Sequence, residues 1–151
     1  MFIERFATPD GLGHFQVVPY QPPPELPDEE YPYVLTNGRV IFHFHSGTMT
    51  RRTEKLHNEV PKAFVEINFD EALEKGIEEG DELILRSRRG ELKAIARPTH
   101  DIKRGLLFLP WHFPDSGPNV LTGPMAGPPS KMPEFKFVAV TIEGLKRPWG
   151  N

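Results

Sequence analysis

Short apolar runs separated by turns that contain glycine or proline recur along the chain, and this spacing predicts strands rather than long helices. Five such runs occur, at residues 31–37, 39–45, 64–68, 106–110 and 135–143. The dipeptide Asn37-Gly38 is typical of a tight turn and would join the first two runs. The run at 106–110 is apolar throughout, which is typical of a strand buried on both faces.

Between these runs the sequence predicts one hairpin and one capped helix. The hairpin spans residues 78–99 and turns at Arg89-Gly90, so that the RSRR run at residues 86–89 would form its solvated tip. Asn68 can cap a helix with Glu71 completing a capping box, and Gly76 is a suitable stop. A mainly β domain of about six strands, with one or two short helices, indicates a closed barrel.

The first 30 residues have a different pattern. Residues 1–20 predict two short strands around the turn Pro9-Asp10-Gly11. Residues 21–30, QPPPELPDEE, combine prolines that favour extended polyproline geometry with carboxylates that favour solvation. We therefore expect an N-terminal arm and proline-rich linker over residues 1–30, and one barrel domain over residues 31–151.

Composition limits the classes of function. The chain has 151 residues and no cysteine, which excludes disulfides, thiolate metal sites, iron–sulfur ligation and thiol catalysis within it. A formal net charge of -3 gives no overall attraction to nucleic acid, so any anion site has to be local. We find neither an apolar run of membrane-spanning length nor a signal peptide, and we expect a cytoplasmic protein with no membrane insertion.

The stretch HFHSGTMTRR, residues 43–52, concentrates hydrogen-bond donors. Gly47 permits a tight turn with outward-facing amides, and the stretch adds hydroxyl and guanidinium groups that are suited to a phosphate: Ser46, Thr48, Thr50, Arg51 and Arg52. The same residues are common in ordinary loops, so the pattern alone leaves both interpretations open.

Histidine and the late polar residues offer further candidates. His43 and His45 would share one face of a strand and suit a metal pair, but no third ligand is evident, and hydrogen-bonding roles remain open for them and for His112. In the long segment from 111 to 133, Asn119 can recognise a nucleobase or pterin edge. Lys131 and Lys136 can meet phosphates. Because the sequence contains no GxSxG or HExxH motif, it favours ligand binding over catalysis.

A resemblance to one known domain is carried by four ordered blocks: YPYVLTNGRVIFHFHSGTMTRR, FVEINFDEALEKGIEEGDELILRSRRGELKAIARPT, IKRGLLFLPWHF, and NVLTGP followed by SKMPEFKFVAVTIE. Together they resemble the C-terminal molybdopterin-dinucleotide-binding domain of formate dehydrogenase catalytic (alpha) subunits, within the dimethyl-sulfoxide-reductase superfamily. The resemblance covers almost the whole chain. It implies a double-psi β-barrel and, as ligand, a bis-molybdopterin guanine dinucleotide cofactor with molybdenum or tungsten.

Matched residue by residue, the blocks imply a set of cofactor-binding positions: Thr36, Gly38, Arg39, His43, His45, Gly47, Thr48, Met49, Thr50, Arg51, Asn119, Phe135 and Lys136. The last three correspond to positions that hold one guanine nucleotide in the family. Phe135 is often tyrosine in relatives, so a phenolic hydrogen bond is not implied there.

The resemblance also implies parts that this chain does not contain. In the family, upstream domains supply the metal-ligating cysteine or selenocysteine and usually an iron–sulfur cluster, and these domains would be the partner. We expect a C-terminal domain or a split subunit of a formate-dehydrogenase-like oxidoreductase, inactive as an isolated chain. Two alternatives are a stand-alone β-barrel that binds proteins or nucleic acid without a cofactor, and a histidine-based metal hydrolase.

Overall fold

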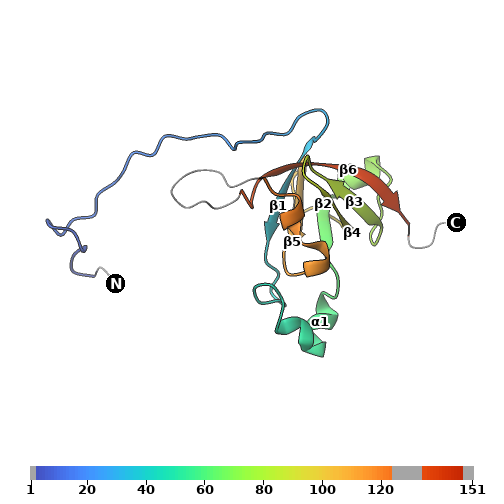
Figure 1. The fold of residues 1–151 in the computed structure, drawn as a ribbon, viewed down its shortest axis with the longest axis horizontal. Helices are drawn as coiled ribbons and strands as arrows, with labels where there is room; N and C mark the ends of the chain where they lie inside the picture. Colours follow the sequence, from blue (N-terminus) through green and yellow to red (C-terminus); the bar gives the residue numbers. More distant parts are fainter. Residues whose placement is uncertain (1–2, 124–133, 148–151) are drawn as a thin grey trace.

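The centre of the protein is a closed barrel of six strands (Figure 1). The computed structural model describes residues 3–123 and 134–147. Its strands are β1 (Tyr33–Gly38), β2 (Phe64–Asn68), β3 (Glu82–Arg86), β4 (Glu91–Thr99), β5 (Leu106–Pro110) and β6 (Val138–Lys146). They follow the order β1-β5-β2-β4-β3-β6 around the barrel, with β1–β5 and β2–β4 parallel. The mainly β closed barrel of about six strands that the sequence indicated is confirmed, as is the double-psi barrel that the resemblance implies.

Alternate apolar side chains from the strands fill the barrel interior. In β4, Leu92, Ala94 and Ala96 are buried while Lys93 is exposed, as the period of two predicted. The uninterrupted run in β5 places Leu107 and Leu109 in the same core, fully buried. Packing of this core holds the strands in place, and the loops that join the strands can therefore form a site outside the core.

Within the described residues two short helices accompany the barrel, α1 (Glu54–Glu59) and α2 (Phe69–Glu74), with 3-10 turns η1 (Thr50–Arg52), η2 (Pro114–Ser116) and η3 (Pro118–Val120). The predicted cap of α2 is confirmed, since the Asn68 side-chain oxygen accepts hydrogen bonds from the amides of Asp70 and Glu71. Gly76 follows the helix with φ 65°, a conformation that glycine adopts readily. The Glu71 carboxylate accepts from the Gly105 amide instead of closing a capping box.

The strand predicted over residues 39–45 does not form. β1 already pairs with β5 on one edge and with β6 on the other, so the chain after Gly38 has no edge of β1 left to pair with. It leaves as a loop that curls where His45 and Gly47 have positive φ. The predicted turn at Asn37-Gly38 is also wrong, because both residues lie inside β1.

Residues 3–30 form an arm without helix or strand, and its N-terminal part extends away from the barrel (Figure 1). The turn at residues 8–11 forms, with the Gly11 amide donating to the Thr8 carbonyl at 3.1 Å. The two strands predicted beside it do not form, since this part of the arm has no neighbouring strand to pair with. Among the described residues, no helix combines the length and apolar composition that crossing a membrane requires.

Strand directions bring distant loops to one end of the barrel. Because β1 and β5 are parallel, the segments after Gly38 and Pro110 leave from the same end. β6 is antiparallel to β1 and β3, so the segment before Val138 and the β3–β4 turn lie there too. We call this end, formed by residues 39–53, 87–90, 111–123 and 134–137, the loop end.

Candidate functional site

A pocket of about 640 Å³ opens at the loop end. Its lining comes from three segments that the barrel brings together: Asn37, Gly38, Arg39, Trp111, Asn119, Phe135 and Lys136. Five of these seven residues are predicted site residues. Two cations, two side-chain amides and two aromatic rings can together hold a planar heterocycle that carries a phosphate group.

Asn37 fastens one wall of this pocket. It is buried at the end of β1, and its side-chain amide donates to the carbonyl oxygen of Phe135. In return the Lys136 ammonium group donates to the main-chain carbonyl of Asn37 and lies 3.5 Å from its side-chain oxygen. The late segment is therefore held against β1 by a reciprocal set of hydrogen bonds.

The adjoining wall depends on close packing at Gly38. A Cβ atom at this position would lie 2.5 Å from a ring carbon of Phe108, so a larger residue would displace that ring. The Gly38 carbonyl accepts from the Trp111 amide at 3.2 Å. This brings the Trp111 ring near Arg39, whose guanidinium carbon lies 5.8 Å from the ring centroid.

His43 fastens the loop that follows β1. The side chain is buried, and its Nε2 donates to the Val60 carbonyl at 2.8 Å, because that carbonyl can only accept. Nδ1 then accepts from the Thr50 hydroxyl at 3.1 Å, and the Thr50 oxygen accepts from the Phe44 amide. These polar atoms thus hold the loop together, and they are engaged within the protein.

His112 connects the same loop to the segment after β5. It is fully buried; its Nε2 accepts from the Val40 amide at 2.9 Å, and its Nδ1 donates to the His45 carbonyl. Burial lowers the pKa of His112 below its usual value, because the charged ring would lose its hydration. The neutral ring is the form that can both accept and donate in this position.

The histidines do not form a metal site among the described residues. No group of three or more histidine, aspartate or glutamate side chains in this part of the chain is arranged to hold a metal ion. His45 packs edge-on against Trp111, with ring centroids 4.9 Å apart. The geometry therefore indicates packing and hydrogen bonding for these rings.

The remaining predicted residues lie at varying distances from the pocket. Arg39 lines both the pocket and an adjoining groove of about 370 Å³ that includes His43 and His45. Thr48 and Met49 are exposed on the same loop, and Arg51 lies with its guanidinium carbon 5.5 Å from the Phe113 ring centroid.

Gly47 has φ 74° and lies close to the His112 carbonyl, where a Cβ would approach to 2.8 Å. Thr36 is half-buried within β1 and lines neither the pocket nor the groove. Lys131 lies outside the described residues.

Sequence reasoning missed two pocket residues, Asn37 and Trp111. Asn37 was assigned to a turn, although a buried asparagine in a strand has to find hydrogen-bond partners. Trp111 follows β5, and its closeness to Arg39 depends on β1 and β5 being parallel neighbours. Trp111 could have been identified only from the parallel pairing of β1 with β5.

Most of this chain matches a known domain family, and nearly all of it matches part of longer proteins. The family described as Molydopterin dinucleotide binding domain matches residues 33–139. The F420-dependent formate dehydrogenase subunit alpha of Methanocaldococcus jannaschii is 49% identical over 142 residues, which cover 94% of this chain and 21% of that protein. The F420-dependent formate dehydrogenase 1 subunit alpha of Methanococcus maripaludis is 43% identical, with the same coverage of each chain. The chain thus spans about a fifth of the length of these relatives.

A solved structure is similar in fold. Acetylene hydratase from Pelobacter acetylenicus gives a TM-score of 0.64 and matches 79% of this chain and 19% of that chain. At 17% sequence identity this similarity concerns the fold alone.

Proposed function

The chain belongs to the Molydopterin dinucleotide binding domain family, and from this premise we propose that its loop end binds bis-molybdopterin guanine dinucleotide with molybdenum or tungsten. We further propose that it does so as the C-terminal domain or a split subunit of a formate-dehydrogenase-like oxidoreductase. Support comes from the two formate dehydrogenase alpha subunits, which align with 94% of this chain.

The observation that carries the proposal is the composition of the pocket. Arg39 and Lys136 supply positive charge for phosphate groups, and Asn119 supplies a side-chain amide for the edge of a guanine or pterin. Trp111 and Phe135 supply aromatic surface for the ring system. The residues present therefore fit the nucleotide part of such a cofactor.

The role of this chain is to bind and orient. The bound cofactor would supply the redox chemistry. The buried histidines hold the loop after β1, and Asn37 holds the segment before β6. The segments that carry Arg39 and Lys136 are therefore fixed by contacts within the protein. Charged donors aimed at a preformed pocket bind phosphate without a large ordering cost.

The proposed partner is the upstream part of the alpha subunit, which would carry the metal ligand and an iron–sulfur cluster. Large apolar side chains are exposed on the loop end, at Ile41, Phe44 and Met49, and on the arm, at Phe15 and Val17. Exposed apolar groups in such number are typical of surfaces that pack against another protein. The relatives' additional length supplies the polypeptide that would cover them.

Titration of the full chain with GDP, followed by NMR, tests the ligand site. We expect GDP to shift resonances of Trp111 and Asn119, and Arg39→Ala to weaken binding by roughly tenfold, because one charged hydrogen bond is lost. Arg104→Ala is the matched control, since Arg104 pairs with Glu74 at the other end of the barrel. An absence of shifts at the pocket, or equal affinity in Arg39→Ala and wild type, would contradict the proposal.

A further inference from the structure

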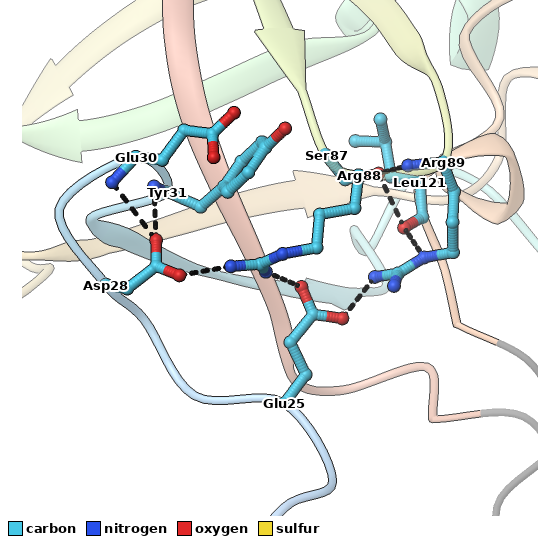
Figure 2. Close-up of polar contacts among 8 residues, drawn as sticks. All are labelled: Glu25, Asp28, Glu30, Tyr31, Ser87, Arg88, Arg89 and Leu121. Carbon is cyan, nitrogen blue, oxygen red and sulfur yellow. Dashed lines mark hydrogen bonds and ion pairs between the residues drawn. The ribbon is translucent and has the colours of Figure 1, made fainter.

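The tip of the β3–β4 hairpin is bound to the arm by ion pairs (Figure 2). The two oxygens of the Glu25 carboxylate each meet a different arginine, Arg88 at 2.6 Å and Arg89 at 2.6 Å. Arg88 also binds the carboxylate of Asp28 and lies with its guanidinium carbon 4.4 Å from the Tyr31 ring centroid. The three arginines of the RSRR run are exposed, as its sequence indicated, but Arg88 and Arg89 are also the attachment point of the arm.

The same hairpin tip also holds a carbonyl on its other side. The main-chain oxygen of Leu121 accepts from the Ser87 hydroxyl at 2.9 Å and from Arg89 Nε at 3.0 Å (Figure 2). Ser87 and Leu121 are buried, so water cannot readily reach the Leu121 carbonyl and replace these donors. Arg89 thus joins the arm, through Glu25, to the segment that contains Leu121.

That segment carries a pocket residue. The Leu121 amide donates to the Pro118 carbonyl at 2.9 Å and closes the turn η3, in which Asn119 lies. Gly90 packs directly on this turn, since a Cβ there would lie 2.9 Å from the Val120 carbonyl oxygen. The hairpin tip therefore contacts the turn through both hydrogen bonds and close packing.

We infer that Ser87, Arg89 and Glu25 form a positioning network that fixes the Asn119 turn at the pocket, so that attachment of the arm contributes to the geometry of the site. The ligand role of Asn119 rests on the proposed function, whereas the network itself rests on these contacts. The Glu25 and Arg89 side chains are only 20% and 25% exposed, so their ion pair is less screened than one in open solvent.

Arg88 provides a control within the same cluster. Its ion pairs join it to Glu25 and Asp28 of the arm, whereas Arg89 has in addition the bond to Leu121. Removing Arg88 leaves the ion pair between Glu25 and Arg89 and both bonds to the Leu121 carbonyl intact, so the turn should stay in place. Arg89→Lys keeps a positive charge for the ion pair with Glu25 but lacks the Nε–H group that donates to the Leu121 carbonyl. This variant therefore tests the bond to the turn while the ion pair is kept.

The test is amide hydrogen exchange of Leu121 in the full chain, measured by NMR for Ser87→Ala, Arg89→Ala, Arg89→Lys and Arg88→Ala. We expect exchange to accelerate by roughly tenfold in the first three variants, because each loses a bond that holds the turn against the hairpin tip. In Arg88→Ala the rate should stay within about twofold of wild type. The Leu107 amide, in the core strand β5, serves as reference for global stability.

GDP affinity of the same variants connects the network to the site. We expect weaker binding in the Ser87 and Arg89 variants, and affinity close to that of wild type in Arg88→Ala. Unchanged exchange at Leu121 in the Ser87 and Arg89 variants would overturn the inference, as would equal acceleration in Arg88→Ala. If exchange follows the expected order but the wild type does not bind GDP, the positioning network stands and the proposed ligand site fails.

Discussion

At the scale of single residues, buried polar side chains determine the shape of the loop end. Asn37, His43 and His112 are all buried, and each has its polar ring or amide atoms bonded to main chain or hydroxyl groups. Leaving such a group without its partner costs about 1–3 kcal/mol. Each of these residues therefore fixes one segment of the pocket wall, although none of them needs to contact a ligand.

The neutral state of His112 predicts a pH dependence. Because burial lowers its pKa in the folded state, the unfolded chain binds more protons as the pH falls below about 6.5. The stability contributed by neutral His112 is thus present above that pH and is lost progressively as the pH falls toward the folded-state pKa. We expect the free energy of unfolding in urea to decrease between pH 7.5 and pH 5.

His112→Asn tests this assignment. Asparagine can keep the donor to the His45 carbonyl but does not titrate, so the variant should be less stable at pH 7.5 and have a shallower slope with pH. The difference between the wild-type and variant curves of unfolding free energy against pH gives the contribution of His112 apart from that of the other histidines. Parallel curves would show that this ring does not titrate differently in the folded and unfolded states.

Local chemistry at these residues was predictable, but their partners were not. The sequence indicated correctly that Gly47 permits a tight turn and that Asn68 caps a helix, because both depend on neighbours within a few positions. The roles of His43 and His112 stayed open, because the bond between His112 and the Val40 amide joins residues 72 positions apart. Burial, which decides between a structural and a ligand-binding histidine, is a property of the fold.

At the scale of elements, pairing decided which apolar runs became strands. The hairpin β3–β4 was predicted because its two strands are adjacent in sequence and joined by a short turn. Residues 39–45 have the aromatic and β-branched composition of a strand, yet both edges of β1 are taken by β5 and β6. Composition describes what a segment tolerates, whereas the available edges determine what it forms.

The cap of α2 makes a prediction at this scale. Asn68→Ala removes the acceptor for the Asp70 and Glu71 amides and the donor to the Ile102 carbonyl at 2.9 Å. We expect a loss of about 1–2 kcal/mol in the free energy of unfolding, measured in urea. Asn58→Ala, at an exposed position of α1, should change it by less than about 0.5 kcal/mol. Equal effects of the two substitutions would contradict the cap.

At the scale of the whole molecule, a closed barrel carries an arm that makes few contacts with it. The barrel supplies the core, and the arm meets it chiefly through the carboxylates of Glu25 and Asp28. Residues before this attachment expose most of their apolar side chains, with Phe15, Val17 and Tyr20 each at least 85% exposed. We propose on this basis that residues 1–30 and 31–151 form the arm with its linker and the barrel domain.

Limited digestion with chymotrypsin tests this division. Cleavage should occur first after Phe15 or Tyr20, because the backbone there is extended, exposed and outside any sheet. The product should keep the attachment at Glu25 and unfold cooperatively with nearly the same midpoint as the full chain. Early cleavage within β1 to β6, or protection of the arm, would contradict the division.

The order of strands around the barrel has a consequence for synthesis on the ribosome. Of the six strand pairings in the described part of the chain, only β3–β4 joins strands that are consecutive in sequence, and β1 needs both β5 and β6. A topology with so many distant contacts folds slowly, since long loops have to close before the contacts stabilise them. The first strand therefore waits, unpaired, until β5 has emerged, and one of its edges stays open until β6 follows. Nascent chains of this protein should depend on chaperones during that interval.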